Sequence, residues 1–342
     1  MKTYRTLIIL VIASVLAGLL TQGDFFTARN LTNLTRQVCI NGILSIGMTY
    51  VILTGGIDLS VGSVAALAGI AAGILQVNFG YGAMGVSGAL ISILGAVSVG
   101  ALWGLINGLI IVKSKVVPFI ITLGIMVIAR GLALILSKGA AIAPLDESFN
   151  YLGQGYFSIS ITIGLLAVAT ALALLKVFRS HKKNLIHVAL ILLIAALSAY
   201  TFLTYKGIPV PVVLFVLIAF IAHYCLNNTV WGRYVIATGS NLNGAFLSGV
   251  PVNKITFFVY LITGTLAGLS GAVLSARLNG AMPTAGDLFE LDAIAAVVIG
   301  GTKLTGGVGS ISGSVLGAFL IGVLNNSMSL LNVDEFYQKV IK

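Results

Sequence analysis

Charged side chains are scarce in this sequence. Only 8% of the 342 residues are Asp, Glu, Lys or Arg, and 58% are hydrophobic, whereas about a quarter of the residues in a soluble domain are charged. The mean hydropathy of +1.09 implies more apolar surface than one soluble core can bury. These values exclude a soluble enzyme, a disordered chain and a secreted disulfide scaffold, and they indicate a protein embedded in a lipid bilayer.

Residues that hold metals or carry nucleophilic catalysis are also few. Cys39 and Cys225 both lie within apolar runs, which favours neither a disulfide nor a cysteine-based metal site. The three histidines lack metal-ligand spacing, and no Ser-His-Asp arrangement or pair of carboxylates stands out. We therefore expect no catalytic residue, no metal site and no cofactor.

A nucleotide-binding motif is missing as well. A Walker A loop needs a glycine directly before its lysine, and no lysine in this chain follows a glycine. If ATP drives the protein, another subunit must bind the nucleotide. A proton-coupled transporter would need several acidic residues within its helices; at most two are present, so proton coupling is disfavoured.

The net charge of +10 does not indicate a nucleic-acid partner. The basic residues are scattered over short connections between apolar runs, without a basic stripe or interleaved aromatic residues. In a membrane protein, such an excess mostly reflects loops on the cytoplasmic side.

Apolar runs long enough to cross a bilayer fill most of the chain. A crossing helix needs about 20 residues, and the tenth run is short enough to be a half-helix. The eleven predicted segments are 4–21, 36–53, 59–77, 84–112, 117–136, 159–178, 185–204, 210–225, 255–276, 287–301 and 313–331. The sequence predicts an all-α polytopic membrane protein with a single transmembrane domain over residues 1–342.

Basic residues orient these segments. If the N-terminus is cytoplasmic, alternation places the basic groups at 113–115, 179–183 and 233–254 on the cytoplasmic side, as the positive-inside rule requires. Asp24 and the acidic pair 146–147 then lie outside. Eleven crossings end outside, and a new apolar run begins at the last residues, so we expect a final transmembrane helix that this sequence does not contain. The alternative is that the protein ends there.

The sequence contains two incompatible signs of internal repetition. In one register the Thr-Gly-Gly stretch at 54–57 matches 305–308; in the other, Gly-Leu-Ile-Asn at 104–107 matches Gly-Val-Leu-Asn at 322–325. The second register also superimposes the second segment on the ninth and the fourth on the eleventh. Duplicated halves are common in transporters, but two registers that disagree cannot both be meaningful.

A few polar residues within or beside the apolar segments are candidates for a translocation path. Asp58 lies between two segments and Asp292 opens the tenth, and buried carboxylates are costly unless they serve a function. Asn107 and Asn325 place amides, which can bind sugar hydroxyls, within apolar helices. The alternatives are helix capping by the carboxylates and hydrogen bonds between helices by the amides.

The longest predicted cytoplasmic connection, 227–254, contains its own helix signal. Asn241 is suited to cap a short helix that ends near Gly249. Such a helix between two spans suits docking onto a cytoplasmic partner, and the alternative is a simple connector. The candidate contact residues are Gly239, Asn241, Ala245, Phe246, Ser248 and Gly249.

Seven stretches together resemble the permease subunits of bacterial monosaccharide ABC importers, the ribose, xylose, arabinose and galactose group. They are GILSIGM at 42–48, GIDLSVGS at 56–63, PFIITLG at 118–124, the connection 232–250, PTAG at 283–286, ELDAIAA at 290–296 and GGT at 300–302. The sixth and seventh segments, 159–204, look like the inserted helix pair of the xylose-type branch.

This resemblance implies a function and its partners. The chain would pass a monosaccharide, such as the pentoses xylose or ribose, from a periplasmic binding protein across the bacterial inner membrane, without enzymatic activity of its own. A partner ATPase would dock on 239–250, and a second permease copy would complete the complex. The alternatives are a branched-chain amino-acid ABC permease and a secondary sugar transporter.

Overall fold

The structure, a computed structural model, is built from helices and describes residues 2–114, 116–179 and 185–341. Two isolated antiparallel bridges are the only β pairings within these ranges. The helices are α1 (Lys2–Leu20), α2 (Ala28–Leu53), α3 (Val61–Gly73), α4 (Val86–Ser114), α5 (Pro118–Ser137), α6 (Glu147–Gln154), α7 (Ile159–Arg179), α8 (Leu185–Leu203), α9 (Val210–Asn228), α10 (Val230–Ser240), α11 (Leu242–Leu247), α12 (Val252–Leu278), α13 (Phe289–Ile299), α14 (Ile311–Leu330) and α15 (Glu335–Ile341).

Each of the eleven predicted apolar segments corresponds to a helix, and the all-α prediction is confirmed. α2 begins at Ala28, well before the predicted start, because the Thr27 hydroxyl accepts a hydrogen bond from the Asn30 amide and caps a polar first turn. The third segment ends in a π-helical turn, Ile74–Asn78. The prediction omitted α6 and treated α10 as part of a connection, because both are short and hydropathy marks only long apolar runs.

Seven of the described helices are long and apolar enough to span a membrane. Within its most apolar window, α2 is 89% buried, whereas α4, α5 and α9 are less than a third buried. α2 therefore runs through the protein interior, with Ile43, Ile46 and Met48 fully enclosed. The outer helices direct large apolar side chains outward, as a lipid-facing surface requires.

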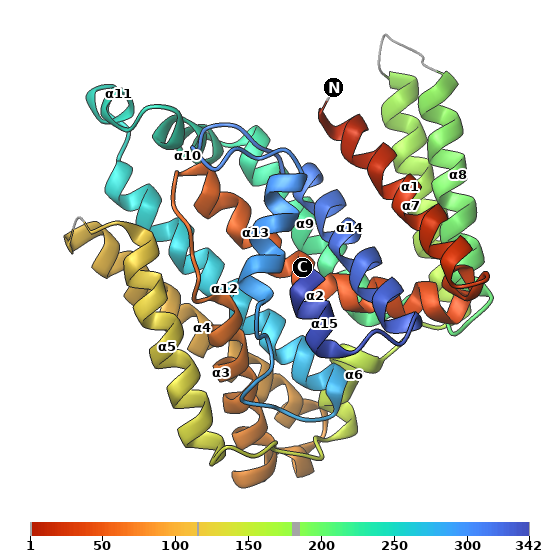
Figure 1. The fold of residues 1–342 in the computed structure, drawn as a ribbon, viewed down its shortest axis with the longest axis horizontal. Helices are drawn as coiled ribbons and strands as arrows, with labels where there is room; N and C mark the ends of the chain where they lie inside the picture. The colour runs from red at the N-terminus through yellow and green to blue at the C-terminus, as the bar shows by residue number, and fades with distance from the viewer. Residues whose placement is uncertain (1, 115, 180–184, 342) are drawn as a thin grey trace.

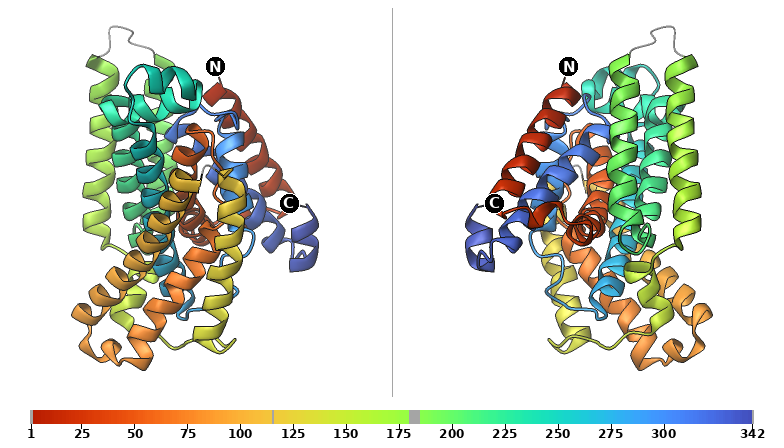
Figure 2. Two further views of the ribbon diagram at one scale, coloured as in Figure 1. Left: turned by 90° about the vertical axis from the view of Figure 1, so that its left-hand side faces the viewer. Right: turned by 90° about the vertical axis from the view of Figure 1, so that its right-hand side faces the viewer.

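The two ends of the molecule are distinguished by their connections. Figures 1 and 2 show α10 and α11 at the same end as the start of α1 and as the facing ends of α7 and α8. The turn from α3 to α4 and the connection from α5 to α6 lie at the opposite end. This grouping agrees with the predicted alternation of the segments; of the basic residues used for that prediction, Lys115, Lys182 and Lys183 lie outside the described residues.

Two stretches of chain enter the protein without forming a helix. Residues 54–60 connect α2 to the short α3, and residues 279–288 connect α12 to the short α13. The order of long helix, non-helical stretch, short helix and long helix thus occurs twice, in α2–α4 and in α12–α14. Since α2 ends where α12 begins, beside α10 and α11, the two runs point in opposite directions (Figure 1).

The structure therefore distinguishes between the two repeat registers. The register that pairs 104–107 with 322–325 superimposes α4 on α14 and agrees with the order of the helices. The Thr-Gly-Gly register is not a structural repeat, because 54–57 follows a long helix and 305–308 follows the short α13. The two Thr-Gly-Gly turns instead meet in space, where a Cβ on Gly306 would lie 3.1 Å from the backbone nitrogen of Gly55.

α7 and α8 form a peripheral hairpin. At its base, the Phe157 amide donates to the Ile208 carbonyl (2.9 Å) and the Val210 amide donates to the Gly155 carbonyl (3.0 Å). The Thr32 hydroxyl of α2 donates to the Thr201 carbonyl of α8 (3.3 Å). This arrangement is compatible with an inserted helix pair at 159–204.

Candidate functional site

The predicted short helix in the 227–254 connection is present as α11. The Asn241 side-chain oxygen accepts a hydrogen bond from the Gly244 amide (2.9 Å), which makes Asn241 the N-cap. Gly249, with a φ of 81°, follows the C-cap residue Ser248. Together, α10 and α11 form a helical segment between the spans α9 and α12, rather than an irregular connector.

α11 has one buried and one exposed side. Ala245 is 6% exposed and packs into the core, whereas Phe246 and Leu247 are 70% and 84% exposed. Leu242 and Ser248 also lie on the exposed side. α11 itself lies at the end of the bundle that also holds α10 (Figure 1). An exposed apolar patch of this kind is typical of a protein-binding surface.

Gly239 connects this segment to the interior. A Cβ on Gly239 would overlap the Leu53 carbonyl and approach the backbone nitrogen of Gly307, so only glycine permits this contact. The Gly307 amide also donates a hydrogen bond to the Leu53 carbonyl (2.9 Å). We call these three residues the glycine junction. It joins the last turn of α10 to the end of α2 and to the connection between α13 and α14, backbone to backbone.

The first polar cluster surrounds Asp58 at the start of α3. One Asp58 carboxylate oxygen accepts hydrogen bonds from the Ser60 amide (2.9 Å) and hydroxyl (2.6 Å). The Asn107 amide of α4 donates to the Ser60 hydroxyl (2.9 Å), and the Tyr260 hydroxyl of α12 lies against Gly56. Ser60, rather than Asp58, occupies the N-cap position. The alternative of Asp58 as the cap is therefore wrong by two residues.

The second polar cluster surrounds Asp292 in the first turn of α13. One Asp292 carboxylate oxygen accepts hydrogen bonds from the side-chain amides of Asn41 on α2 and Asn325 on α14, both at 3.3 Å. All three residues are buried. The four predicted path residues are thus divided between two clusters, Asp58 with Asn107 and Asp292 with Asn325.

The N-termini of α3 and α13 meet in the protein interior. A Cβ on Gly62 of α3 would overlap the Gly286 carbonyl and lie 2.5 Å from a Glu290 carboxylate oxygen. Several buried polar atoms of this region have no hydrogen-bond partner among the described residues: Asn41 Oδ1, Asn107 Oδ1, Tyr260 Oη, Glu290 Oε2 and Asn325 Oδ1. Buried polar groups are nearly always paired, so this concentration of open acceptors is a candidate site for a hydroxyl-rich ligand.

Arg130 of α5 holds the second non-helical stretch in place. One guanidinium nitrogen donates to the carbonyls of Pro283 (2.6 Å) and Ala285 (2.8 Å). These bonds satisfy backbone groups that neither a helix nor water would satisfy at membrane depth.

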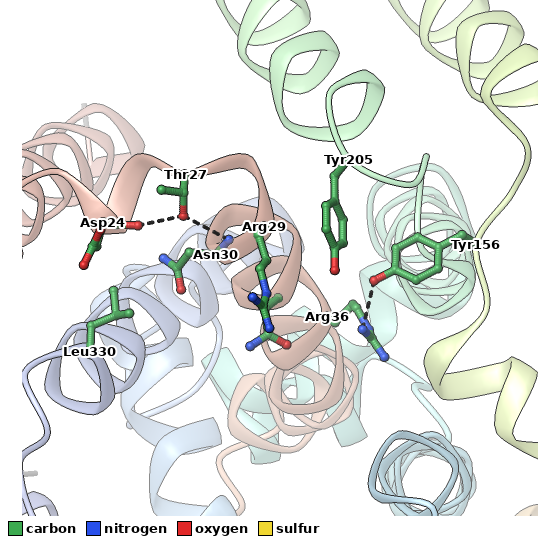
Figure 3. A pocket seen from close by; sticks show the side chains of 9 residues that line it. Asp24, Thr27, Arg29, Asn30, Arg36, Tyr156, Tyr205 and Leu330 are labelled. Carbon is green, nitrogen blue, oxygen red and sulfur yellow. Dashed lines mark hydrogen bonds between the residues drawn. The ribbon is translucent and has the colours of Figure 1, made fainter.

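A polar pocket of about 460 Å³ lies where α1 ends and α2 begins. Figure 3 shows Arg29 and Asn30 on one side, and Arg36 beside Tyr156 and Tyr205, at the base of the α7–α8 hairpin, on the other. Burial raises the pKa of the Tyr156 hydroxyl, although Arg36 opposes this shift. Tyr156 is therefore neutral near pH 7 and can accept the Arg36 hydrogen bond (3.0 Å).

The sequence prediction missed the partners in these sites. Ser60 lies within the GIDLSVGS stretch but was not singled out as a site residue, and Tyr260 carries no motif. Only the folded chain brings Asn107 to Ser60 and Tyr260 to Gly56. The pocket did leave a signal, since Asn30, Asn33, Gln37 and Asn41 recur at helical spacing on α2. Such a polar stripe on a transmembrane helix predicts a hydrated or functional face.

Comparisons with known proteins cover almost the whole chain. The family described as "Branched-chain amino acid transport system / permease component" matches residues 30–341. The xylose transport system permease protein XylH of Haemophilus influenzae is 35% identical over 100% of this chain and 93% of its own length. The ribose import permease protein RbsC of Bacillus subtilis is 39% identical over 98% of this chain and 86% of its own length.

The ribose import permease protein RbsC of Escherichia coli K12 is 36% identical over 99% of this chain and 89% of its own length. No solved structure matches the chain. The full-length matches agree with the helical, multi-pass architecture and with a transport subunit. The chain therefore belongs to the family of transport-system permease components that this description defines.

Proposed function

We propose that this chain is the membrane-spanning permease subunit of an ATP-driven monosaccharide importer, with a pentose such as xylose or ribose as its substrate. The observation that carries the proposal is the 35–39% identity, over nearly the full chain, to relatives that are named for xylose or ribose transport. The buried clusters support it, because amides, hydroxyls and carboxylates suit a polyhydroxyl ring. A branched aliphatic substrate would instead need an apolar pocket.

A cytoplasmic ATPase subunit would dock on α11 and hydrolyse the ATP. Phe246 and Leu247 would enter a groove of that partner, because a desolvated aromatic anchor is typical of a binding hot spot. The end that carries α10, α11 and the start of α1 would then be cytoplasmic. Arg233 of α10 and Lys254 in the first turn of α12 flank α11, and Lys113 lies in the last turn of α4; the positive-inside rule favours basic residues such as these on the cytoplasmic side.

The sugar path would pass between the two polar clusters. Asp58 and Asn107 would bind hydroxyls on one side of the path, and Asp292 and Asn325 on the other. The contact of Gly62 with Gly286 would close the path in the present conformation. Because this contact joins two helix N-termini rather than two helix flanks, a small tilt of either helix would open it.

The glycine junction gives ATP hydrolysis a mechanical route to this contact. ATP binding to the partner would close its nucleotide domains and move α11 and α10. Gly239 would transmit that motion to the end of α2 and to residues 54–60, which lead to Asp58. The same motion would reach the connection between α13 and α14 at Gly307.

The remaining partners follow from the same assignment. A periplasmic binding protein would deliver the sugar to the opposite end, and a second permease copy would complete the membrane part of the complex. The protein would reside in the bacterial inner membrane with a cytoplasmic N-terminus. Sugar selectivity can then lie in the binding protein, so the permease need not bind its substrate tightly.

The test is uptake into proteoliposomes that contain the permease, its ATPase subunit and the binding protein. Labelled D-xylose or D-ribose should accumulate only with ATP, and labelled leucine should not. Phe246→Ala and a scrambled 239–250 segment should abolish uptake and leave membrane insertion intact. Phe220→Ala is the matched control, because Phe220 is 68% exposed on α9, away from α11.

Pentose accumulation driven by an ion gradient without the ATPase would contradict the proposal, and so would leucine uptake in preference to pentose. Normal uptake after scrambling 239–250 would contradict the docking role of α11.

A further inference from the structure

The pocket in Figure 3 and the proposed docking segment α11 lie near different ends of α2. The pocket opens at the first turns of α2, whereas the last turn of α2 reaches the glycine junction. The 26-residue α2 is about 39 Å long at 1.5 Å per residue, so the two sites are far apart along this helix.

The lining of this pocket is unusual for so apolar a chain. Among its lining residues only Leu330 is aliphatic, and the others carry an amide, a hydroxyl, a charge or an aromatic ring. The side chains of Arg29 and Asn33 make no hydrogen bond to any residue that the structure describes, so their side-chain donors are open. A monosaccharide presents hydroxyls around its edge and C–H groups on its faces, and it needs this combination of polar donors and an aromatic surface.

The aromatic wall of the pocket is held in a fixed position. The rings of Tyr156 and Tyr205 meet edge to face, with their centroids 6.0 Å apart. Arg36 binds the Gly153 carbonyl (2.9 Å) as well as the Tyr156 hydroxyl, and the Lys206 ammonium lies 5.7 Å from the Tyr205 ring centroid. The wall is therefore organised before any ligand arrives, which lowers the entropic cost of binding.

Amides of α2 and α14 lie both at the pocket and in the second polar cluster. At the pocket, Asn30 and Asn326 exchange two hydrogen bonds of 2.9 Å each through their side chains. In the cluster, Asn41 and Asn325 bind Asp292. Asn30 and Asn41 share one face of α2, so the same helix pair supplies amides to both sites.

We propose that this pocket binds a monosaccharide at the entrance of the permease, with the Tyr205 ring against a C–H face of the sugar and with Arg29 and Asn33 bound to its hydroxyls. This inference rests on the proposed sugar transport and adds a specific entry site to it. The aromatic wall at the base of the α7–α8 hairpin would then contribute to the choice of sugar.

The first experiment measures sugar binding directly. The purified permease in lipid nanodiscs, without its ATPase or binding protein, is mixed with D-xylose or D-ribose, and saturation-transfer NMR records magnetisation transfer to the sugar C–H protons. The signal should be strongest at one face of the ring and should disappear in Tyr205→Ala and Asn33→Ala. Tyr224→Ala and Asn78→Ala are the matched controls, because both residues are exposed and lie outside the pocket.

The second experiment uses the complete importer in proteoliposomes. Tyr205→Ala and Asn33→Ala should raise the sugar concentration at half-maximal uptake by about tenfold, the change expected when one good contact is lost. The maximal rate and the ATPase activity should stay within about twofold of the unmodified importer, because neither residue touches α11.

Three outcomes would overturn the entry site. The NMR signal could persist in both pocket variants, or it could fall equally in the controls. The variants could instead raise only the concentration of binding protein that is needed, in which case the pocket docks that protein and not the sugar. Failure of the unmodified importer to take up any pentose would count against the proposed function itself.

Discussion

Asn107 and Asn325 occupy equivalent positions in two inverted halves of the protein. Asn107 of α4 donates its side-chain amide to Ser60 at the start of α3 (2.9 Å), and Asn325 of α14 donates its amide to Asp292 at the start of α13 (3.3 Å). Each amide thus secures the first turn of the short helix that precedes its own helix. The third partner in each cluster, Tyr260 or Asn41, comes from the first long helix of the other half.

This equivalence predicts similar effects of substitutions in the two halves. Asn107→Ala and Asn325→Ala should each lower the unfolding free energy by about 1–3 kcal/mol, because a buried partner is left unpaired, and both should reduce pentose uptake. Asn325→Asp should be more harmful than Asn325→Ala, since it adds a second carboxylate beside Asp292. Thermal unfolding in detergent and uptake in proteoliposomes check these outcomes, with the exposed Asn78→Ala as control. Loss of uptake in only one of the two alanine variants would contradict the equivalence.

The contact between the start of α3 and the chain before α13 predicts that a variant with this contact disrupted lets sugar leak through the permease. In Gly62→Ala the added methyl group would overlap the Gly286 carbonyl and force the helix N-termini apart, at a cost of about 1–3 kcal/mol. Proteoliposomes with this variant should release trapped pentose without ATP, whereas those with the unmodified permease should retain it. Gly124→Ala is the control, because a Cβ there meets nothing within 4 Å. Equal retention by both variants would show that the contact does not close the path.

The glycine junction predicts that a substitution there uncouples ATP hydrolysis from sugar uptake. Gly239→Ala places a methyl group against the Leu53 carbonyl and the Gly307 amide, so α10 must move away from both. We expect the assembled importer to hydrolyse ATP at a rate that sugar and binding protein no longer stimulate. Uptake should fall about tenfold or more, which corresponds to a loss of about 1.4 kcal/mol of coupling free energy. Gly131→Ala is the control, because a Cβ at Gly131 meets nothing within 4 Å, and this variant should behave like the unmodified protein. Tightly coupled uptake in Gly239→Ala would be the contrary result.

Substitutions of Arg130 should lower the stability of the protein to different degrees. Arg130→Ala leaves the carbonyls of Pro283 and Ala285 without their charged donor, which should cost about 1.5–3 kcal/mol for hydrogen bonds to a charged group. Arg130→Lys should lie between the alanine variant and the unmodified protein, because one nitrogen makes both bonds and an ammonium can supply two donors. Thermal unfolding and the rate of proteolysis within residues 279–288 measure the order of stability of the three proteins. A lysine variant as unstable as the alanine variant would indicate that the guanidinium shape, rather than the donors, is required.

The sequence by itself determined the features that depend on neighbouring residues. Apolar runs of bilayer length fixed the helical membrane class and the positions of all eleven segments, because hydropathy and helix length are local properties. The same holds for α11, where Asn241 signals a cap that needs only Gly244, three residues ahead. The match of 104–107 with 322–325 was one of two competing repeat registers, and the sequence alone did not choose between them.

Only the tertiary structure decided which distant residues meet. Ser60 reaches Asp58 locally, two residues along the chain. Nothing local brings Asn107 to Ser60, Tyr260 to Gly56 or Asn41 to Asp292, and these contacts form only when the helices pack together. The pocket at Tyr156 and Tyr205 likewise needs the α7–α8 hairpin to rest on α2. The physical reason is that interior polar groups must find partners in the absence of water. The geometry of the whole bundle selects those partners, and the conformational propensities of neighbouring residues do not determine that geometry.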